Sequence, residues 1–269
     1  MKSIHYELYI SVKYANPNGD PQDGGRPRQD SDGYGEISPV SIKRQLRDVA
    51  AALVEEHPDK YDPAAFRIFQ STDDGLTKLE KSAKYGDAPK FFWDSRMFGE
   101  QHMFSGEKSI KRFAAVSVGM AHSIDPIEIC DVQITSSVPY EKNTKADNDE
   151  GKNKGKKKGE GSMGFIHYVK EGVYRCYIST APRGIKKNDI SELDIELLEE
   201  ALKYMYCQNC SLTRPIGHIM VDKLVKIEHP DALSIPFTAV SATKEGDHYV
   251  YNIDEKLLKE RNCKATVLV

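Results

Sequence analysis

The sequence has few cysteines and no apolar run of the roughly 20 residues that a membrane-spanning helix needs. Its five cysteines are odd in number and scattered, which does not fit the disulfide framework of a secreted domain. Met1-Lys2-Ser3 leads directly into a strand pattern rather than into a signal peptide. We therefore expect a cytoplasmic protein with no membrane partner.

The sequence also lacks an excess of positive charge. It holds 38 Lys and Arg against 41 Asp and Glu, a net charge of −3 with a pI near 6.3. Nucleic-acid-binding domains are usually basic, so such a function would have to depend on where the cations cluster. Walker, serine-elbow and Cys–His patterns are absent as well, which argues against the common nucleotide-hydrolysing and nucleophilic enzymes.

What the sequence does have is a dense turn-forming stretch near its N-terminus. Asn16-Pro17-Asn18-Gly19-Asp20-Pro21 combines two strong chain-reversal signals, and Gly19 can adopt the positive φ that such turns need. Arg26 and Arg28 follow in a glycine-rich loop. Backbone can approach a ligand closely in such a loop, and the two arginines are candidate ligand contacts.

A helix is predicted to begin directly after this loop. Ser38 followed by Pro39 is typical of an N-cap with proline at the first helical position. Lys43, Arg44 and Arg47 form a basic stripe about 120° from the apolar one. By itself this pattern fits an ordinary amphipathic helix with a solvated basic face. The apolar stripe consists of Ile42, Leu46, Val49, Ala50 and Leu53.

Several blocks in a fixed order carry a resemblance to a known family. The stretch from Asn16 to Asp48, then Asp94–Gly99, then Ser123–Ile127, resembles the backbone subunit of type I CRISPR surveillance complexes. This is the seventh Cas family of the repeat-associated RNA-binding (RAMP) superfamily, and the blocks are most similar to its subtype I-C and I-B branch. The resemblance extends over roughly residues 4 to 228.

The resemblance implies a non-catalytic crRNA-binding protein. Such a subunit oligomerises along the guide RNA into the helical backbone of the Cascade complex and presents the guide for pairing with target DNA. The implied partners are crRNA, the target DNA strand, further copies of the chain, and the large, small and crRNA-end-capping Cascade subunits. Neither a cofactor nor a metal is implied.

The resemblance also assigns candidate contact residues, in two groups. One group would bind the guide RNA, with the last three as weaker candidates: Asn18, Arg26, Arg28, Ser41, Lys43, Arg44, Arg47, Lys111, Arg112 and Arg175. The other would reach nucleic acid from a protruding thumb: Lys152, Lys154, Lys156, Lys157, Lys158 and Met163.

The expected order of elements is strand, helix, strand, strand, insertion, strand, helix, strand. The segments are an alternating strand over residues 4–14, the helix after Ser38, strands over 113–122, 127–138 and 173–178, a capped helix from Ser191, and a strand over 219–227. This order predicts an α+β, modified RRM-like (ferredoxin-like) domain with an antiparallel sheet. The RNP1 sequence is missing, so base stacking across an open sheet is not expected. Tyr9 either stacks on a base or is packed under an insertion.

Two insertions are expected in this single domain over residues 1–269. Residues 57–108 predict a finger-like helical insertion, with short helices near 63–69 and 76–85. Residues 141–161 hold seven lysines, five acids and four glycines, a composition that cannot form a core of its own. We expect a thumb hairpin over residues 140–164; a linker between domains is the alternative. The tail after Pro230 is not placed by any pattern.

Three other functions stay open at this stage. The loop aspartates Asp20, Asp23, Asp30 and Asp32 predict a divalent-ion site if the chain is a metal-dependent ribonuclease of the RAMP superfamily. Cys207-x-x-Cys210, with His218 nearby, is half of a zinc site or a redox pair. A plain interaction scaffold with solvated basic residues is the third.

Overall fold

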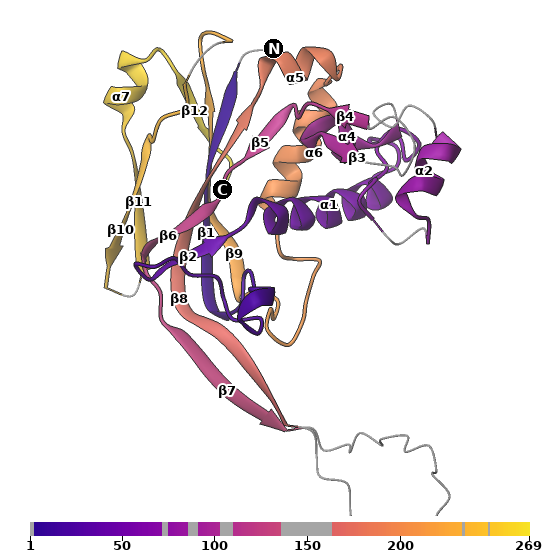
Figure 1. Cartoon of the computed structure of the whole chain (residues 1–269). Coiled ribbons are helices and arrows are strands. Elements are labelled where there is room, and N and C mark those ends of the chain that lie inside the picture. Colours follow the sequence, from indigo (N-terminus) through magenta and orange to yellow (C-terminus); the bar gives the residue numbers. More distant parts are fainter. Residues whose placement is uncertain are drawn as a thin grey trace, which may run out of the picture.

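A computed structural model describes residues 3–71, 75–85, 91–102, 110–135, 163–232, 235–246 and 248–269. Its central feature is an eight-stranded antiparallel sheet, with the strand order β12-β9-β1-β8-β6-β2 and with β5 and β7 also paired to β8 (Figure 1). The strands are β1 Ile4–Ala15, β2 Tyr34–Ile37, β5 Val116–Val118, β6 Ala121–Pro126, β7 Ile129–Thr135, β8 Met163–Thr180, β9 Ile219–Glu228 and β12 Lys264–Val267.

The connections confirm the expected modified RRM-like fold. Along the chain, β1, helix α1 (Pro39–Glu56), β6, β8, helix α6 (Glu192–Lys203) and β9 follow one another. Across the sheet these four strands lie in the order β9-β1-β8-β6, which is the fourth, first, third and second in the chain. This is a split βαβ arrangement in which each neighbouring pair is antiparallel.

Helices α1 and α6 cover one face of the sheet (Figure 1). Helix α1 begins at the expected place, since the Ser38 hydroxyl accepts a hydrogen bond from the Ser41 N–H and Pro39 is the first helical residue. Helix α6 begins with a capping box between Ser191 and Asp194. Their apolar stripes pack on the side chains of β1 that point the same way, among them Tyr6, Leu8, Ile10 and Val12.

The tail that the sequence did not place covers the other face of the sheet. It forms β10 Val240–Glu245, β11 His248–Ile253 and α7 Glu255–Glu260, which lie opposite α1 and α6 in Figure 1. Tyr9 is fully buried beneath it, and its hydroxyl donates to the Val240 carbonyl at 2.6 Å. Of the two alternatives for Tyr9, packing is therefore the one that the structure has.

The segment between α1 and β5 is only partly helical. It contains α2 Lys78–Tyr85, α4 Trp93–Phe98, β3 Glu100–His102 and β4 Ile110–Arg112. The helix predicted near residues 63–69 is wrong, because this stretch forms turns followed by a bridge between Arg67 and Phe92. Helix α4 is anchored by Trp93, which is fully buried and donates its indole N–H to the Asp194 carbonyl at 3.2 Å.

Strands β7 and β8 continue out of the sheet as a long hairpin (Figure 1). Their pairing runs from Ile129 opposite Val169 to Thr135 opposite Met163. Strand β8 is 18 residues long, three times the predicted 173–178. Residues 123–126, which lay between two predicted strands, belong to β6. The lysine-rich segment expected as the thumb lies outside the described residues, apart from Met163 and Gly164.

None of the helices among the described residues has the length and apolar character that crossing a bilayer requires.

The tail is held to the sheet by a buried carboxylate. Glu7 of β1 is fully buried and accepts hydrogen bonds from the Ala239 and Val240 N–H groups at 2.5 and 3.2 Å. Burial raises the pKa of Glu7 to about 7 from 4.5, although these hydrogen bonds and the charge of Arg175 oppose the shift. Between those pH values the folded state retains a proton that the unfolded chain releases, so Glu7 makes folding less favourable as the pH rises through this window.

Glu7→Gln should remove this pH dependence. The free energy of unfolding of the variant, relative to the native chain, should rise by about 1–3 kcal/mol from pH 5 to pH 8, since one pKa unit corresponds to about 1.4 kcal/mol. Urea unfolding at both pH values measures it. Taking the difference cancels His5, whose pKa burial lowers to about 4 and which contributes with the opposite slope. The control is Glu245→Gln on exposed β10; a pH-independent difference for Glu7→Gln would refute the assignment.

Candidate nucleic-acid interface

The loop between β1 and β2 is folded back on itself by side-chain and backbone hydrogen bonds. Asn16 donates its side-chain amide to the Gly25 carbonyl at 2.8 Å. A Cβ on Gly19 would lie 2.8 Å from that same carbonyl oxygen, so only glycine allows this close approach. A short 3₁₀ turn, η1 (Pro21–Asp23), closes at Gly24, whose φ is +59°.

Two of the predicted RNA contacts join this loop to the start of α1. The Asn18 side-chain oxygen accepts from the Ser38 N–H at 2.7 Å, and its amide contacts the Gly19 carbonyl at 3.2 Å. The Ser41 hydroxyl donates to the Pro17 carbonyl at 3.4 Å. Asn18 and Ser41 therefore fix where the loop sits relative to the helix, and with it the position of the loop arginines.

The loop arginines are both paired with carboxylates of the chain. Arg26 lies 2.7 Å from Asp131 of β7, which links the loop to the base of the β7–β8 hairpin. The His167 ring also lies 2.7 Å from Asp131, and hydrogen bonds from His167 and Arg26 lower the pKa of that carboxyl. Arg28 lies 3.3 Å from Asp20, and its buried Nε has no hydrogen-bond partner within the described part of the chain.

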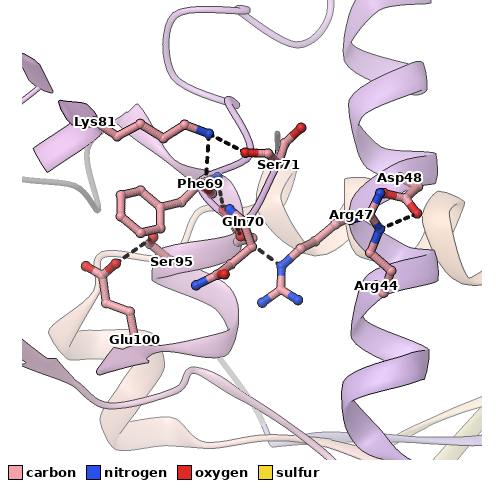
Figure 2. Close-up of polar contacts among 10 residues, drawn as sticks. Arg44, Arg47, Asp48, Phe69, Gln70, Ser71, Lys81, Ser95 and Glu100 are labelled. Atoms are coloured by element: carbon pink, nitrogen blue, oxygen red, sulfur yellow. Dashed lines mark hydrogen bonds and ion pairs between the residues drawn. The ribbon is translucent and has the colours of Figure 1, made fainter. Parts of the chain in front are cut away.

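The three cations of the basic stripe on α1 differ in exposure. Arg44 is the most exposed, at 53%, and contacts Asp48 one turn later at 2.8 Å (Figure 2). Arg47 is only 13% exposed. Lys43 is partly buried, and its ammonium lies 5.6 Å from the centre of the Phe98 ring. Burial, and then the neighbouring charge of Arg47, lower the pKa of Lys43.

Arg47 points toward the insertion rather than into solvent (Figure 2). Its Nε donates to Asp94 at 2.8 Å, and that carboxylate, 1% exposed, also accepts from the Phe69 and Gln70 N–H groups at 2.6 and 3.1 Å. The guanidinium also lies 5.4 Å from the centre of the Phe98 ring. Arg47 thus fastens α1 to the insertion, a role that its place on a basic stripe did not suggest.

The three weaker candidates do not join this surface as a group. Arg112 is paired with the buried Glu100 at 2.6 Å. Arg175 of β8 points to the tail side of the sheet, over the Tyr177 ring at 5.3 Å, and lines a cavity of about 440 Å³ there. Lys111 lies in β4, and its side chain is outside the described part of the chain. Lys152, Lys154, Lys156, Lys157 and Lys158 are likewise outside it.

The structure therefore brings together the loop, the basic stripe of α1 and helix α4, and places Arg175 on the opposite face of the sheet. The residues that sequence reasoning missed are the carboxylates Asp94 and Asp131 and the ring of Phe98. Asp94 and Phe98 do fall in one of the blocks that carry the family resemblance. Their place in this block was the signal in the sequence that could have pointed to Asp94 and Phe98.

The loop aspartates take part in turn geometry. Asp20 accepts from the Gln22 N–H at 3.0 Å, and Asp30 accepts from the Asp32 and Tyr34 N–H groups at 2.9 and 2.8 Å. Cys207 and Cys210 are exposed free thiols. Within the described ranges, no three His, Cys, Asp or Glu side chains are grouped so that they could hold a metal ion.

Comparison with known proteins gives one family and one fold. The family model described as CRISPR-associated protein Cas7 matches residues 2–253. A solved chain of a "CRISPR RNA-guided surveillance complex" is similar with a TM-score of 0.55 and 14% identity, covering 97% of this chain and 81% of that one. A second, from a "CRISPR RNA-guided surveillance complex, pre-nicking", has a TM-score of 0.51 and 13% identity, with 88% and 80% covered. No curated protein sequence matches.

Arg47→Ala and Arg44→Ala should differ strongly in stability. Removing Arg47 leaves the buried Asp94 carboxylate without its cation, which should cost about 3–5 kcal/mol. Removing Arg44 breaks an exposed pair one turn apart and should cost under about 0.5 kcal/mol. Urea unfolding followed by circular dichroism measures both, and equal losses would show that the Arg47–Asp94 pair does not hold the insertion.

Proposed function

Since the chain belongs to the CRISPR-associated Cas7 family, we propose that it is the crRNA-binding backbone subunit of a type I CRISPR surveillance complex. The observation that carries this proposal is the family match over residues 2–253. It is supported by the loop between β1 and β2, which carries two arginines and is hydrogen-bonded to the start of α1, the helix with the basic stripe. In the proposed role the chain binds and presents a guide strand and performs no chemistry on it.

The cations of this surface would contact guide phosphates to different degrees. Arg44 is half exposed and paired only with a nearby carboxylate, so its guanidinium can turn to a phosphate at little cost. Arg26 and Arg28 are about one-third exposed and would exchange or share their carboxylates. Arg47 would not contact a phosphate itself. Through its ion pair with Asp94 and its place over the Phe98 ring, it would help to position Lys43, which lies over the same ring. Asn18 and Ser41 would hold the loop in place for these contacts.

The β7–β8 hairpin would be the base of the thumb. Its strands pair up to Thr135 and Met163, and the lysines between them, Lys152 to Lys158, would then reach nucleic acid from the tip. Copies of the chain would repeat along one crRNA as a helical filament, together with the large, small and end-capping Cascade subunits. In RNA-guided complexes of this kind target DNA is read through base pairing with the guide, while protein contacts the backbone.

A metal-dependent ribonuclease is the second candidate. It would use Asp20, Asp23, Asp30 and Asp32, although the turn hydrogen bonds of Asp20 and Asp30 already give those two a structural role. Magnesium-dependent cleavage of an RNA complementary to the guide, abolished by Asp20→Asn together with Asp23→Asn, would favour it. An uncut strand together with retained guide RNA would favour the binding role.

Binding of a guide-like RNA should depend steeply on salt. The four cations that would contact phosphates, Arg26, Arg28, Lys43 and Arg44, predict a slope of log affinity against log salt of about −3, at roughly −0.7 for each contact. Lys43→Ala with Arg44→Ala should make the slope less steep by about 1.4, or roughly 0.7 for each phosphate that is no longer neutralised. A fluorescence titration at several salt concentrations measures it.

The matched control for this test is Lys256→Ala with Lys259→Ala. These α7 lysines are 88% and 80% exposed and lie on the other side of the sheet. The control should leave the slope unchanged. A flat salt dependence of the native chain would remove the phosphate contacts from the proposal, and equal changes in both variants would remove the α1 stripe.

Assembly along the strand should make binding cooperative. A long RNA that holds several copies should bind each copy more tightly than an RNA that holds one, as for other proteins that coat single strands. Titrations of both lengths, with binding stoichiometry determined by analytical ultracentrifugation, measure this effect. The same affinity per copy on both lengths would contradict filament formation and leave the single-copy binding mode intact.

A further inference from the structure

Helix α5 (Pro182–Lys187), which the sequence analysis did not predict, carries three exposed cations in six residues. They are Arg183, Lys186 and Lys187. No carboxylate among the described residues forms an ion pair with any of them. By contrast, Arg26, Arg28, Arg44, Arg47 and Arg112 each have a carboxylate within 3.3 Å. The positive charge of the described surface is therefore less neutralised at α5 than at these five arginines.

Two of these cations are gathered on one aromatic ring. The guanidinium carbon of Arg183 lies 5.3 Å from the centre of the Phe113 ring, and the ammonium of Lys187 lies 4.7 Å from it. Phe113 is 46% exposed. Arg183 and Lys187 lie one turn apart on α5 and so face the same side of the helix, and cation–π attraction offsets part of the repulsion between their like charges. No carboxylate of the described chain neutralises these neighbouring cations. They are therefore suited to bind an anion that carries several charges close together.

The backbone under this cluster is fixed by close packing. Asn188 donates its side-chain amide to the Phe113 carbonyl at 2.8 Å and to the Arg96 carbonyl at 2.7 Å. A Cβ on Gly184 would clash with the Ala114 backbone, so α5 approaches this segment as only glycine permits. The cations are thus placed before any ligand arrives, which lowers the entropic cost of binding one.

The cluster continues the basic face of α1. A Cβ on Gly99 would lie 3.1 Å from the carbonyl carbon of Phe113, so the backbone after Phe98 touches the segment that carries Phe113. Phe98 in turn has Lys43 and Arg47 over its ring, at 5.6 and 5.4 Å. Two aromatic rings, each with two cations, are therefore carried by touching segments that link α1 to α5.

We propose that Phe113, Arg183, Lys186 and Lys187 form a second phosphate-binding site, which holds the backbone of the same guide strand that contacts α1. This inference rests on the proposed function, because it extends the guide-binding surface to α5. The ligand chemistry is the phosphodiester backbone of a single strand. The Phe113 ring organises the cations, and its faces are not required for base stacking.

The test is Arg183→Ala with Lys187→Ala, compared with the native chain on a single-stranded RNA long enough to cross the whole subunit. Affinity should fall by roughly tenfold at moderate salt, and the salt slope should become less steep by about 1.4, as expected when two phosphates are no longer neutralised. Phe113→Leu should give a smaller decrease, because both cations remain but are no longer gathered. Lys256→Ala with Lys259→Ala is again the control and should change neither quantity.

The outcomes separate this inference from the proposed function. If the α5 variant behaves like the control while Lys43→Ala with Arg44→Ala weakens binding, the inference is overturned and the guide-binding role stands. If neither variant weakens binding, both the α5 site and the proposed guide-binding role are contradicted. A second arm uses single-stranded DNA of the same sequence. If the α5 variant binds this DNA more weakly than the native chain does but binds RNA as well as the native chain, the assignment to the guide is overturned. Binding of poly-glutamate that the α5 variant abolishes, with RNA binding unchanged, would assign the cluster to an acidic protein instead. Unchanged thermal melting confirms that the variants fold.

Discussion

The burial of β1 on both faces is the constraint on which the rest of the structure depends. Its side chains toward α1 and α6 are apolar, but those on the other side include His5, Glu7 and Tyr9, and all three are fully buried. A strand with polar groups inside needs partners for them. The C-terminal tail supplies these partners, as the Val240 backbone does for Glu7 and Tyr9. The tail covers the sheet face that ordinary RRM domains leave open for bases, so in the proposed role nucleic acid would be bound elsewhere.

In the proposed role, ion pairs would explain how a chain with a net charge of −3 can hold a nucleic-acid strand. The arginines of the first loop and of α1 already lie beside Asp131, Asp20, Asp48 and Asp94. Each pair keeps the guanidinium in a defined position at low local net charge. In the proposed role a phosphate would take the place of the carboxylate at each arginine or bind the arginine beside it. Such pairs would contribute more to the orientation of the strand than to the affinity. The cations of α5 have no such partner in the described structure and would contribute attraction more directly.

Local signals predicted the elements that local chemistry determines. Ser38-Pro39 fixed the start of α1 and the Ser191 capping box that of α6, because each cap forms within one turn. The order of elements, together with the family resemblance, predicted the RRM-like fold. Long-range pairing was not predictable in the same way: β8 extends to Met163 because β7 lies beside it, and the tail is placed by Glu7 more than 230 residues away. The partner of Arg47 was hidden for the same reason, since a basic stripe does not reveal that Asp94 is buried beside it.

Strand β8 has a mechanical consequence. It is one uninterrupted strand of 18 residues, roughly 60 Å at 3.3 Å per residue, and it pairs with β1 in the sheet and with β7 in the hairpin. A force on the hairpin at Thr135 and Met163, its last described pair, is therefore carried along a continuous strand to β1 in the centre of the sheet. Arg26 braces the base of this lever through Asp131. A force on the hairpin would thus also act on the loop between β1 and β2, because the Arg26–Asp131 ion pair joins the two.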